Sequence, residues 1–405
     1  MKQPEKISLI TPEQAWEIIQ ASAPLCAKVI RTTEAALGYV LAEPLKSPIN
    51  LPLFDNSAMD GYALKFSDYA GDIRQYSVRG TVSAGKTKPL EPLGKGEVYR
   101  IFTGAAIPTG ADTVIMREQV VEEKNSLLIQ NPSLQQGANI RKQGRHIHKG
   151  DVILEKGHRL NAGSIGFLSS LGIAKVKVFD KPKISVIVTG DELVRPGSSL
   201  RPGQIFESNS GALKAALKVM DLKPVSCTGV KDIEIRVLAA IRKALKSSDL
   251  IILTGGISAG DLDFVKTALP KAGVKCLFYQ LAQKPGKPLF FGKKKKTLVF
   301  ALPGNPASVL TCFYEYVSLA IQCMQGGQDS ALQKIHLPLA EGYLKNPEFS
   351  LFLKGRIDGN KVHILEGQES DSMHSFALGN CLVFLHPGKK AYATNDLVEV
   401  HLIRS

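Results

Sequence analysis

The sequence lacks the paired cysteine spacings that mark zinc sites and disulfide frameworks. Its 405 residues include only six cysteines, scattered along the chain. Zinc-binding domains space their ligands a few residues apart, and small disulfide-linked domains are far richer in cysteine. This usage is typical of a protein from a reducing compartment. The six are Cys26, Cys227, Cys276, Cys312, Cys323 and Cys381.

Long apolar segments are also lacking. Residues 1–16 contain no continuous apolar core of the signal-peptide type, and no apolar run approaches the roughly 20 residues that a membrane span needs. No helix-turn-helix, zinc-finger or RNA-binding motif is recognisable. The sequence therefore predicts a cytoplasmic protein whose partners include neither a membrane nor a nucleic acid.

The charge of the chain is unbalanced toward the positive. A net charge of +14 favours anionic partners such as phosphorylated small molecules, with a basic surface kept for solubility as the alternative. The one long run of charge, Lys293–Lys296, lies between two apolar stretches and predicts a solvated hairpin or loop.

The length predicts two to four domains. Thr11, Pro12 and Gln14 form a helix-start pattern, and Asn161 and Gly172 bracket a second, short helix. Between residues 50 and 150 strands are short, Gly and Pro recur and helical periodicity is missing, which predicts a β-rich insertion. Beyond about residue 330 short strands predict a small β-domain.

Residues 182–325 alternate buried strands with amphipathic helices. Apolar runs at 184–188, 250–253 and 298–302 each end in a Gly-rich turn, and helices are predicted near 210–220 and from Asp232 onward. Such alternation predicts a parallel-rich sheet covered on both faces. We therefore expect a multidomain α/β fold with a central three-layer α/β domain, and ligands at the carboxyl ends of its strands.

Residues 80–87, GTVSAGKT, match the phosphate-loop pattern letter for letter. That pattern binds nucleotides only between a buried strand and a helix whose N-terminus faces the phosphates. Here residues 74–79 are largely polar, and Pro89 and Pro92 prevent a helix from beginning after the pattern. We predict that these glycines serve strand turns.

Two of the Gly-rich turns carry carboxylates. Residues 254–263, TGGISAGDLD, contain Asp261 and Asp263 as hard oxygen ligands for Mg²⁺, and their glycines let backbone N–H groups approach an anion. Glu192 follows the strand at 184–188 and is directed to the same region. The alternative is a turn whose aspartates only cap helices, and Asp232 has the same alternative.

A rigid turn, KPGKP, carries Lys284 and Lys287. Two ammonium groups on such a turn suit a multiply charged oxyanion, and an ordinary surface turn is the alternative. Residues 55–62, DNSAMDGY, combine two aspartates with a glycine inside the β-rich segment. A structural turn is the other interpretation of that segment.

Taken together, these segments resemble the molybdopterin molybdenumtransferase family, which includes the C-terminal domain of gephyrin. The resemblance covers essentially the whole chain, and its most specific signature is FDNSAMDGYA at 54–63. The other segments follow in the family's order at 100–105, 108–112, 189–193, 284–288 and 302–306.

The resemblance implies a reaction in molybdenum cofactor biosynthesis: Mg²⁺-dependent insertion of molybdate into adenylylated molybdopterin, with release of AMP. A molybdopterin adenylyltransferase would supply the substrate, and the chain would form a homodimer. Four domains are implied. They are 1–26 plus 180–328 for molybdopterin binding, 27–49 plus 150–179 as a linking domain, 50–149 as the β-rich insertion and 329–405 as the C-terminal β-domain.

The resemblance also implies roles for single residues. Asp232 and Asp263 would hold the metal with Glu192 nearby, and Asp60 and Lys284 would complete the catalytic set. Asp60 and its neighbours in the insertion would reach the site across a dimer interface. The substrate-binding residues would be Thr103, Arg141, Ser258, Lys287, Ser308, Lys354 and Ser370.

Three positions depart from the family's pattern. His146 stands where the family usually has Asp, Gln280 where relatives often have Lys, and Lys354 in place of an oxyanion-pocket Arg, which keeps the charge but loses bidentate geometry. These departures motivate an alternative function, a molybdopterin-binding carrier or scaffold with weakened catalysis. Adenylylation of free molybdopterin is a third hypothesis, and the insertion that bears Asp60 argues against it.

Overall fold

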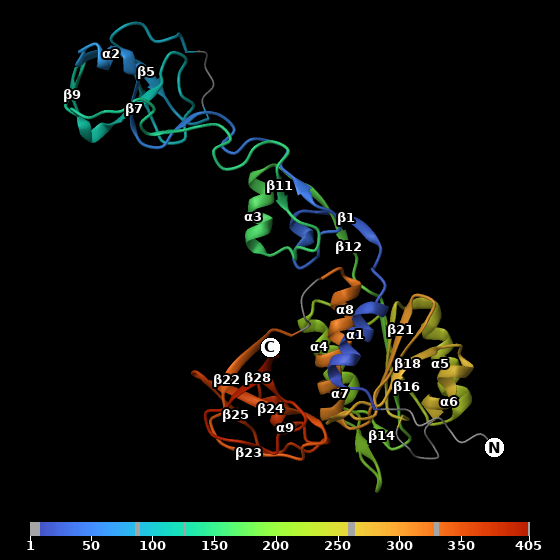
Figure 1. The fold of residues 1–405 in the computed structure, drawn as a ribbon. Helices are drawn as coiled ribbons and strands as arrows, with labels where there is room; N and C mark the ends of the chain where they lie inside the picture. The colour runs from blue at the N-terminus through green and yellow to red at the C-terminus, as the bar shows by residue number, and fades with distance from the viewer. Residues whose placement is uncertain (1–8, 86–89, 125, 258–263, 328–331, 404–405) are drawn as a thin grey trace.

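The computed structural model describes residues 9–85, 90–124, 126–257, 264–327 and 332–403. The chain is elongated, with a β-rich body at one end, a small connecting body in the middle, and an α/β body beside a second β-rich body at the other end (Figure 1). The predicted multidomain α/β fold is confirmed. The domain boundaries given above stay a proposal.

The α/β body is built on a six-stranded sheet in the order β16-β13-β17-β21-β20-β18. The first four strands are parallel. Strand β20 runs antiparallel to β21, and β18 runs antiparallel to β20 and therefore in the direction of the first four. The three predicted apolar strands are β13, β17 and β21, adjacent in the sheet and almost wholly buried. The bounds are β13 (Ile184–Thr189), β16 (Ser226–Val230), β17 (Leu250–Thr254), β18 (Lys275–Tyr279), β20 (Phe290–Lys294) and β21 (Thr297–Leu302).

Helices cover both faces of this sheet, which gives the three layers predicted (Figure 1). On one face Ile19, Leu217 and Ile321 join a single apolar core, and on the other Ile241 and Leu269 belong to a second core. Burying each such side chain contributes about 1.5–3 kcal/mol. The first face carries α1 (Pro12–Ser22), α4 (Asn209–Val219), α7 (Pro306–Cys312) and α8 (Ser318–Met324), and the second carries α5 (Glu234–Ser247) and α6 (Phe264–Lys271).

The predicted helix starts at Thr11 and Asn161 are confirmed. The Gln14 N–H donates to Thr11 Oγ1 (3.3 Å), and the Thr11 N–H donates to Gln14 Oε1 (2.9 Å). At α3 (Ala162–Ser170) the Ser164 N–H donates to Asn161 Oδ1 (2.9 Å). Each side chain satisfies a backbone N–H that has no partner within the helix.

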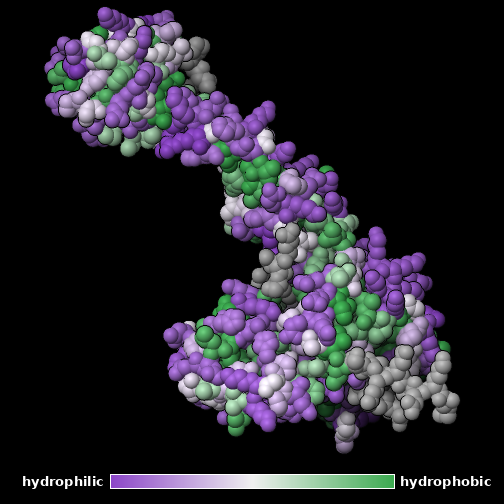
Figure 2. All heavy atoms as spheres, viewed as in Figure 1, coloured by the Kyte–Doolittle hydropathy of each residue, from purple (hydrophilic) through white to green (hydrophobic). Residues whose placement is uncertain are grey.

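One long helical segment corrects an expectation from the sequence. Pro306–Met324 spans 19 residues, including a π-helical turn at Phe313–Val317, and is apolar and long enough to cross a membrane. However, 89% of its apolar window is buried inside the protein. Its apolar residues therefore build the core, and hydrophilic residues cover most of the face seen in Figure 2.

The connecting body joins the α/β body to the distal one by two chain segments. Its antiparallel pair β1–β12 places Val29 opposite Val178. A second pair, β2–β11, and helix α3 complete it. The bounds are β1 (Lys28–Thr32), β2 (Leu45–Lys46), β11 (Val152–Leu154) and β12 (Lys175–Phe179), with a 3₁₀ turn at Glu34–Ala36.

The distal body holds a six-stranded sheet in the order β7-β4-β6-β5-β9-β8. A separate short pair, β3–β10, lies at its base. The elements are β3 (Asn56–Ser57), β4 (Gly61–Leu64), α2 (Phe66–Ala70), β5 (Gln75–Val82), β6 (Glu97–Ile101), β7 (Thr113–Met116), a 3₁₀ turn (Arg117–Gln119), β8 (Val120–Glu123), β9 (Ser126–Ile129) and β10 (Ile140–Arg141).

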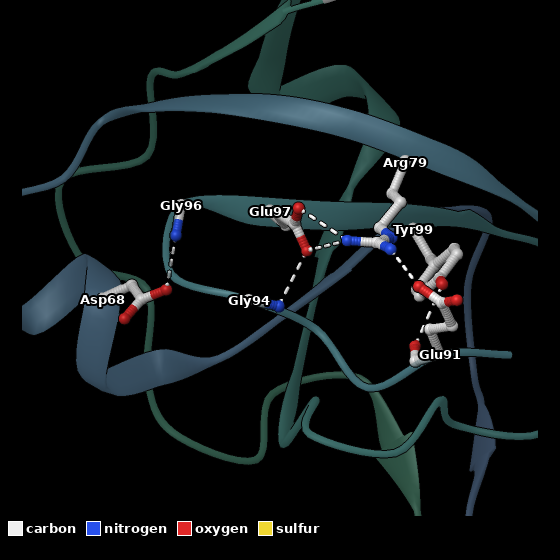
Figure 3. A network of polar contacts seen from close by, with 7 residues as sticks. All are labelled: Asp68, Arg79, Glu91, Gly94, Gly96, Glu97 and Tyr99. Atoms are coloured by element: carbon white, nitrogen blue, oxygen red, sulfur yellow. Dashed lines mark hydrogen bonds and ion pairs between the residues drawn. The ribbon is translucent and has the colours of Figure 1, made fainter.

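The phosphate-loop pattern begins inside strand β5, so Gly80 lies within a strand rather than in the predicted turn, whereas Gly85 lies in a turn with a φ of 75°. Arg79, just before the pattern, donates to both carboxylate oxygens of Glu97 (2.9 and 3.0 Å) and contacts Glu91 (Figure 3). Glu97 also accepts from the Gly94 N–H (2.7 Å). Residues 90–96, the first residues described after the pattern, are not helical. The described part of the pattern, residues 80–85, therefore lacks the strand-to-helix setting that a nucleotide-binding loop needs.

The lysine run forms the hairpin turn predicted for it. Lys294 pairs with Thr297 across β20 and β21, and Lys295 takes the left-handed conformation that such a turn requires (φ 54°).

The C-terminal body is a sheet in the order β19-β24-β26-β28-β22, with β25 beside β24. Strand β19 comes from the lysine-bearing turn of the α/β body, so this sheet connects the two bodies. The bounds are β19 (Gln283–Lys284), β22 (Lys334–Pro338), β23 (Tyr343–Leu344), β24 (Ser350–Asp358), β25 (Lys361–Ile364), α9 (His374–Leu378), β26 (Cys381–Leu385), β27 (Ala391–Tyr392) and β28 (Leu397–Leu402).

A buried charged cluster also holds these two bodies together. His401 of β28 is fully buried, and its Nδ1 lies 2.8 Å from Glu315 Oε1 in the π-helical turn. Its Nε2 lies 2.7 Å from Glu399 Oε1, and Glu399 pairs with Lys334 (3.0 Å). Because charges this deep need partners, the cluster fixes how the C-terminal body sits on the long helix.

Candidate active site

The three Gly-rich turns predicted at the carboxyl ends of β13, β17 and β21 surround one cavity of about 740 Å³. Gly255 makes the closest approach, because a Cβ there would lie 2.6 Å from the Thr189 carbonyl oxygen and its φ is 85°. Only glycine allows these two turns to pack together. We call this space the acidic cavity, and Glu192 and Asp232 line it.

Asp232 is half-buried at the mouth of β16. Helix α5 begins at Glu234 with Ile233 as its N-cap and no capping side chain, so the helix-cap interpretation of Asp232 is wrong. Burial raises the pKa of Asp232, and the neighbouring carboxylates of Asp191 and Glu192 raise it further, against a hydrogen bond from Thr189. The Asp232 N–H also donates to Asp191 Oδ1 (3.3 Å).

These carboxylates suit a divalent cation of the Mg²⁺ type. They are hard oxygen donors, and none of the three forms an ion pair with another described residue. A bound cation would relieve the charge repulsion that raises the pKa of Asp232. Within the described residues, however, no group of three ligands is already arranged for a metal. The predicted residues Asp263 and Ser258 lie outside the described residues.

A second cavity of about 460 Å³ brings together Lys284, Lys287, Ser308 and Ser370, four residues predicted for the oxyanion pocket. We call it the cationic cavity. Both lysines are exposed, and their Nζ atoms lie 5.1 and 5.7 Å from the centroid of the Phe349 ring. The face of an aromatic ring attracts ammonium groups, so Phe349 keeps the two charges close to each other.

The turn that carries the two lysines is anchored in the core. A Cβ on Gly286 would lie 2.5 Å from the Cys312 Sγ, and the φ of Gly286 is 85°, so only glycine fits. Gln283, fully buried, donates to the Pro285 carbonyl (2.9 Å) and accepts from the Tyr316 hydroxyl. The lysines are exposed, but the backbone that bears them is fixed.

The two cavities share a wall formed by Pro288, Pro303 and Asn305. Two consecutive residues, Ser370 and Asp371, line one cavity each. Ser370 Oγ accepts from Asn305 Nδ2 (2.6 Å). The two cavities therefore adjoin each other, so that a single ligand can have one anionic group among the lysines and another on a cation held by the carboxylates.

Comparison with known proteins agrees with this arrangement. The family model "MoeA N-terminal region (domain I and II)" matches residues 10–172, and the "probable molybdopterin binding domain" model matches residues 185–322. A molybdopterin molybdenumtransferase of Haemophilus influenzae is 36% identical over 403 residues, 97% of this chain and 98% of the relative. One from Staphylococcus epidermidis is 32% identical, covering 92% of this chain and 90% of the relative.

The chain belongs to the molybdopterin molybdenumtransferase family. A crystal structure of the molybdopterin biosynthesis MoeA protein of Pyrococcus horikoshii superposes with a TM-score of 0.85 at 32% identity, covering 98% of this chain and all of the other.

In this molybdenumtransferase-family chain the distal site residues lie apart from both cavities. Asp60 accepts from the backbone N–H (2.8 Å) and hydroxyl (2.7 Å) of Thr103, and these bonds hold the pKa of Asp60 below its usual range. Arg141 is exposed in β10 opposite Asn56. Asp60, Thr103 and Arg141 all belong to the distal body, at the opposite end of the molecule from the α/β body, so within one chain they do not reach the cavities (Figure 1).

The three departures from the family's pattern also lie off the cavity walls. His146 is exposed near the base of the distal body, where its N–H donates to the Leu51 carbonyl (2.9 Å). Gln280 precedes the lysine turn in a left-handed conformation (φ 69°). Lys354 is 1% exposed and bonded to backbone carbonyls, so the structure does not bring it to the cationic cavity.

Sequence reasoning missed several residues of the site. Phe349 has no sequence signal, because a single aromatic residue in a polar loop belongs to no motif. Asn305 lay within a recognised turn, but nothing in the sequence showed that its amide bonds Ser370. Gln368 lines the cationic cavity and has no sequence signal that we can name.

Proposed function

We propose that this chain inserts molybdenum, supplied as molybdate, into molybdopterin that carries AMP on its phosphate, and that AMP is released. The observation that carries the proposal is the shared wall between a carboxylate-lined cavity and a lysine-lined cavity. The names of the relatives at 30% identity or more support the same reaction.

The cationic cavity suits a tetrahedral dianion. Lys284 and Lys287 supply two positive charges, and Ser308 and Ser370 supply hydroxyls for hydrogen bonds to the remaining oxygens. Because Gly286 and Gln283 fix the backbone of the turn, only the two lysine side chains need to rearrange when the anion binds. Molybdate bound there would lie beside the shared wall, next to a pterin in the acidic cavity.

The acidic cavity suits the phosphate end of the substrate together with Mg²⁺. Asp232 and Asp263 would hold the cation with Glu192 nearby, and the cation would neutralise the phosphoryl oxygens that the carboxylates alone would repel. The backbone of the Gly255–Gly256 turn lies open to the cavity at this point. Positioning and charge neutralisation are the main requirements of phosphoryl chemistry, and these residues provide both.

Asp60, Thr103 and Arg141 enter this proposal through a second copy of the chain. Within one chain these residues lie far from the cavities, and in a homodimer the second copy would bring its own Asp60, Thr103 and Arg141 to them. A molybdopterin adenylyltransferase would deliver the substrate, and the reaction would take place in the cytoplasm.

The test is to incubate the protein with adenylylated molybdopterin, Mg²⁺ and molybdate, and to measure AMP and active cofactor. Asp232→Asn should slow AMP release at least about a hundredfold, because it removes a metal ligand. Asp358→Asn, an exposed carboxylate at the end of β24, is the matched control and should turn over like the wild type.

Absence of AMP release by the wild type, where a relative turns over in the same assay, would refute the proposal. Tight binding of the substrate under those conditions would instead favour the carrier hypothesis.

A further inference from the structure

We propose that Lys354 is a positioning residue, whose ammonium clamps the loop 366–371 so that Ser370 faces the cationic cavity. The expected effect on the KM for molybdate rests on the function proposed above, whereas the hydrogen bonds that hold the loop do not. The residue replaces an arginine expected to touch the oxyanion, so the proposal assigns this chain a different use of the position.

The direction of the side chain follows from the strand. Successive residues of a β-strand point to opposite faces, and Leu351 and Leu353 of β24 both line the cationic cavity. Phe352 and Lys354 therefore point to the other face, where the Phe352 ring stacks on Phe384 at a centroid distance of 4.6 Å. Lys354 lies beneath α9, with its Nζ 5.9 Å from the centroid of the Phe376 ring.

The Lys354 ammonium group is hydrogen-bonded to the backbone of the loop 366–371. Lys354 Nζ donates to the carbonyl oxygens of Gly367 (2.8 Å) and Glu369 (3.0 Å). Gln368, between them, donates through Nε2 to the Lys354 carbonyl (2.8 Å) and accepts from the Lys354 N–H (3.0 Å). Ser375 Oγ also donates to the Gly367 carbonyl (2.7 Å). Strand and loop are thus bonded at every residue from 367 to 369.

The residues that Lys354 holds are followed directly by Ser370, which lines the cationic cavity. Ser370 is the next residue, and its carbonyl accepts from the N–H groups of Ala307 (3.0 Å) and Ser308 (3.3 Å) at the start of α7. Its hydroxyl accepts from Asn305 on the shared wall (2.6 Å). Lys354 holds one end of the loop and α7 holds the other, so the Ser370 hydroxyl has a fixed place in the cationic cavity, beside the shared wall.

The first experiment uses the wild-type protein. Reductive methylation with formaldehyde and borohydride, followed by peptide mass spectrometry, should modify Lys354 at least about tenfold more slowly than Lys284 and Lys287, because its reaction requires the loop to open. Molybdate should slow the modification of the two exposed lysines and leave the rate at Lys354 unchanged. Modification of Lys354 as fast as Lys284, with molybdate protecting both, would overturn the proposal.

The second experiment compares Lys354→Met with Lys390→Met, an exposed lysine of the same body. Without any substrate, amide hydrogen exchange in residues 366–371 should become at least about tenfold faster in Lys354→Met, because two hydrogen bonds to a charged group are lost. The control should exchange like the wild type. Unchanged exchange in both variants would refute the clamp.

Activity then separates the two proposals. In Lys354→Met the KM for molybdate should rise at least about tenfold while kcat changes less, because the Ser370 hydroxyl is no longer held in place. If the wild type releases no AMP, the proposed function fails, yet exchange and methylation still decide the clamp. If Lys354→Met does not fold, methylation of the wild type decides it.

Discussion

Replacing His401 by glutamine should make the attachment of the C-terminal body to the α/β body nearly independent of pH above neutrality. Burial alone would lower the pKa of His401, but Glu315 and Glu399 outweigh it and raise the pKa from 6.5 to about 9. A rise of this size corresponds to about 3 kcal/mol of stability. Because the folded pKa lies above the unfolded one, this stability is complete below pH 6.5 and is lost as the pH rises through 9.

Glu399, a partner of His401, sets the lower limit of the pH range in which the protein is most stable. A hydrogen bond from His401 lowers the pKa of Glu399 to about 2, with Lys334 contributing. That contribution is present above pH 4.5 and is lost as the pH falls through 2. The two shifts share the contact between His401 and Glu399, so their free energies are not added. Stability should therefore be greatest between about pH 4.5 and pH 6.5.

The single tryptophan provides the assay. Trp16 lies 6.1 Å from the His401 ring between centroids, and Lys334 Nζ lies 3.9 Å from its ring centroid, so its emission reports on this junction. Urea unfolding followed at Trp16 should show the wild type losing about 3 kcal/mol between about pH 6 and pH 9.5. His401→Gln should start lower and show little further loss.

A second histidine substitution controls for the change of residue type. His363 is exposed in β25 of the same body, and His363→Gln should keep the wild-type dependence on pH. A wild-type stability that is flat from pH 6 to pH 9.5, or an equal slope in His401→Gln, would show that the cluster does not carry the charge we assign to it.

Three further experiments test the site. Lys287→Met should raise the KM for molybdate about tenfold with a smaller effect on kcat, measured from AMP release, because one charged hydrogen-bond donor is lost. Gly286→Ala should cost about 1–3 kcal/mol by thermal unfolding, since its Cβ would overlap a buried sulfur 2.5 Å away. Gly388→Ala, with a similar φ of 90° and open space around it, should cost less. Asp60→Ala and Asp232→Asn should each be inactive alone. Refolding the two variants together should restore activity, because a mixed dimer contains one site with both Asp60 and Asp232 intact. If activity is not restored, Asp60 does not belong to the site.

Much of the α/β body could be predicted from the sequence because its signals are strong. Near-continuous apolar runs such as 250–253, each followed by a Gly-rich turn, are typical of strands buried on both faces, and parallel strands bring their following turns to one edge. The sequence alone therefore predicts that Glu192 and the Gly255–Gly256 turn lie at one site, and both line the acidic cavity. The gathering of Lys284, Ser308 and Ser370 came from family resemblance, since no local pattern links these positions.

The remainder depended on side-chain direction, which the sequence does not fix. Asp232 has the look of a helix cap, but the helix begins two residues later, and the side chain turns into the acidic cavity instead. Lys354 follows Leu353 in an unremarkable strand, and shifting its register by one residue would have exchanged the two faces. Only the pairing of Lys354 with Leu382 on β26 decides which of them meets the cavity.

The cationic cavity is lined by residues of two bodies, so oxyanion binding depends on how these bodies are held together. Lys284 and Ser308 belong to the α/β body, whereas Leu353 and Ser370 belong to the C-terminal body. The acidic cavity, apart from Asp371, lies within the α/β body alone. Weaker docking of the two bodies would therefore open the cationic cavity while leaving the carboxylates in place. The β19–β24 pairing, the Lys354 clamp and the His401 cluster each oppose that movement, so oxyanion binding should be lost before the sheet of the α/β body unfolds.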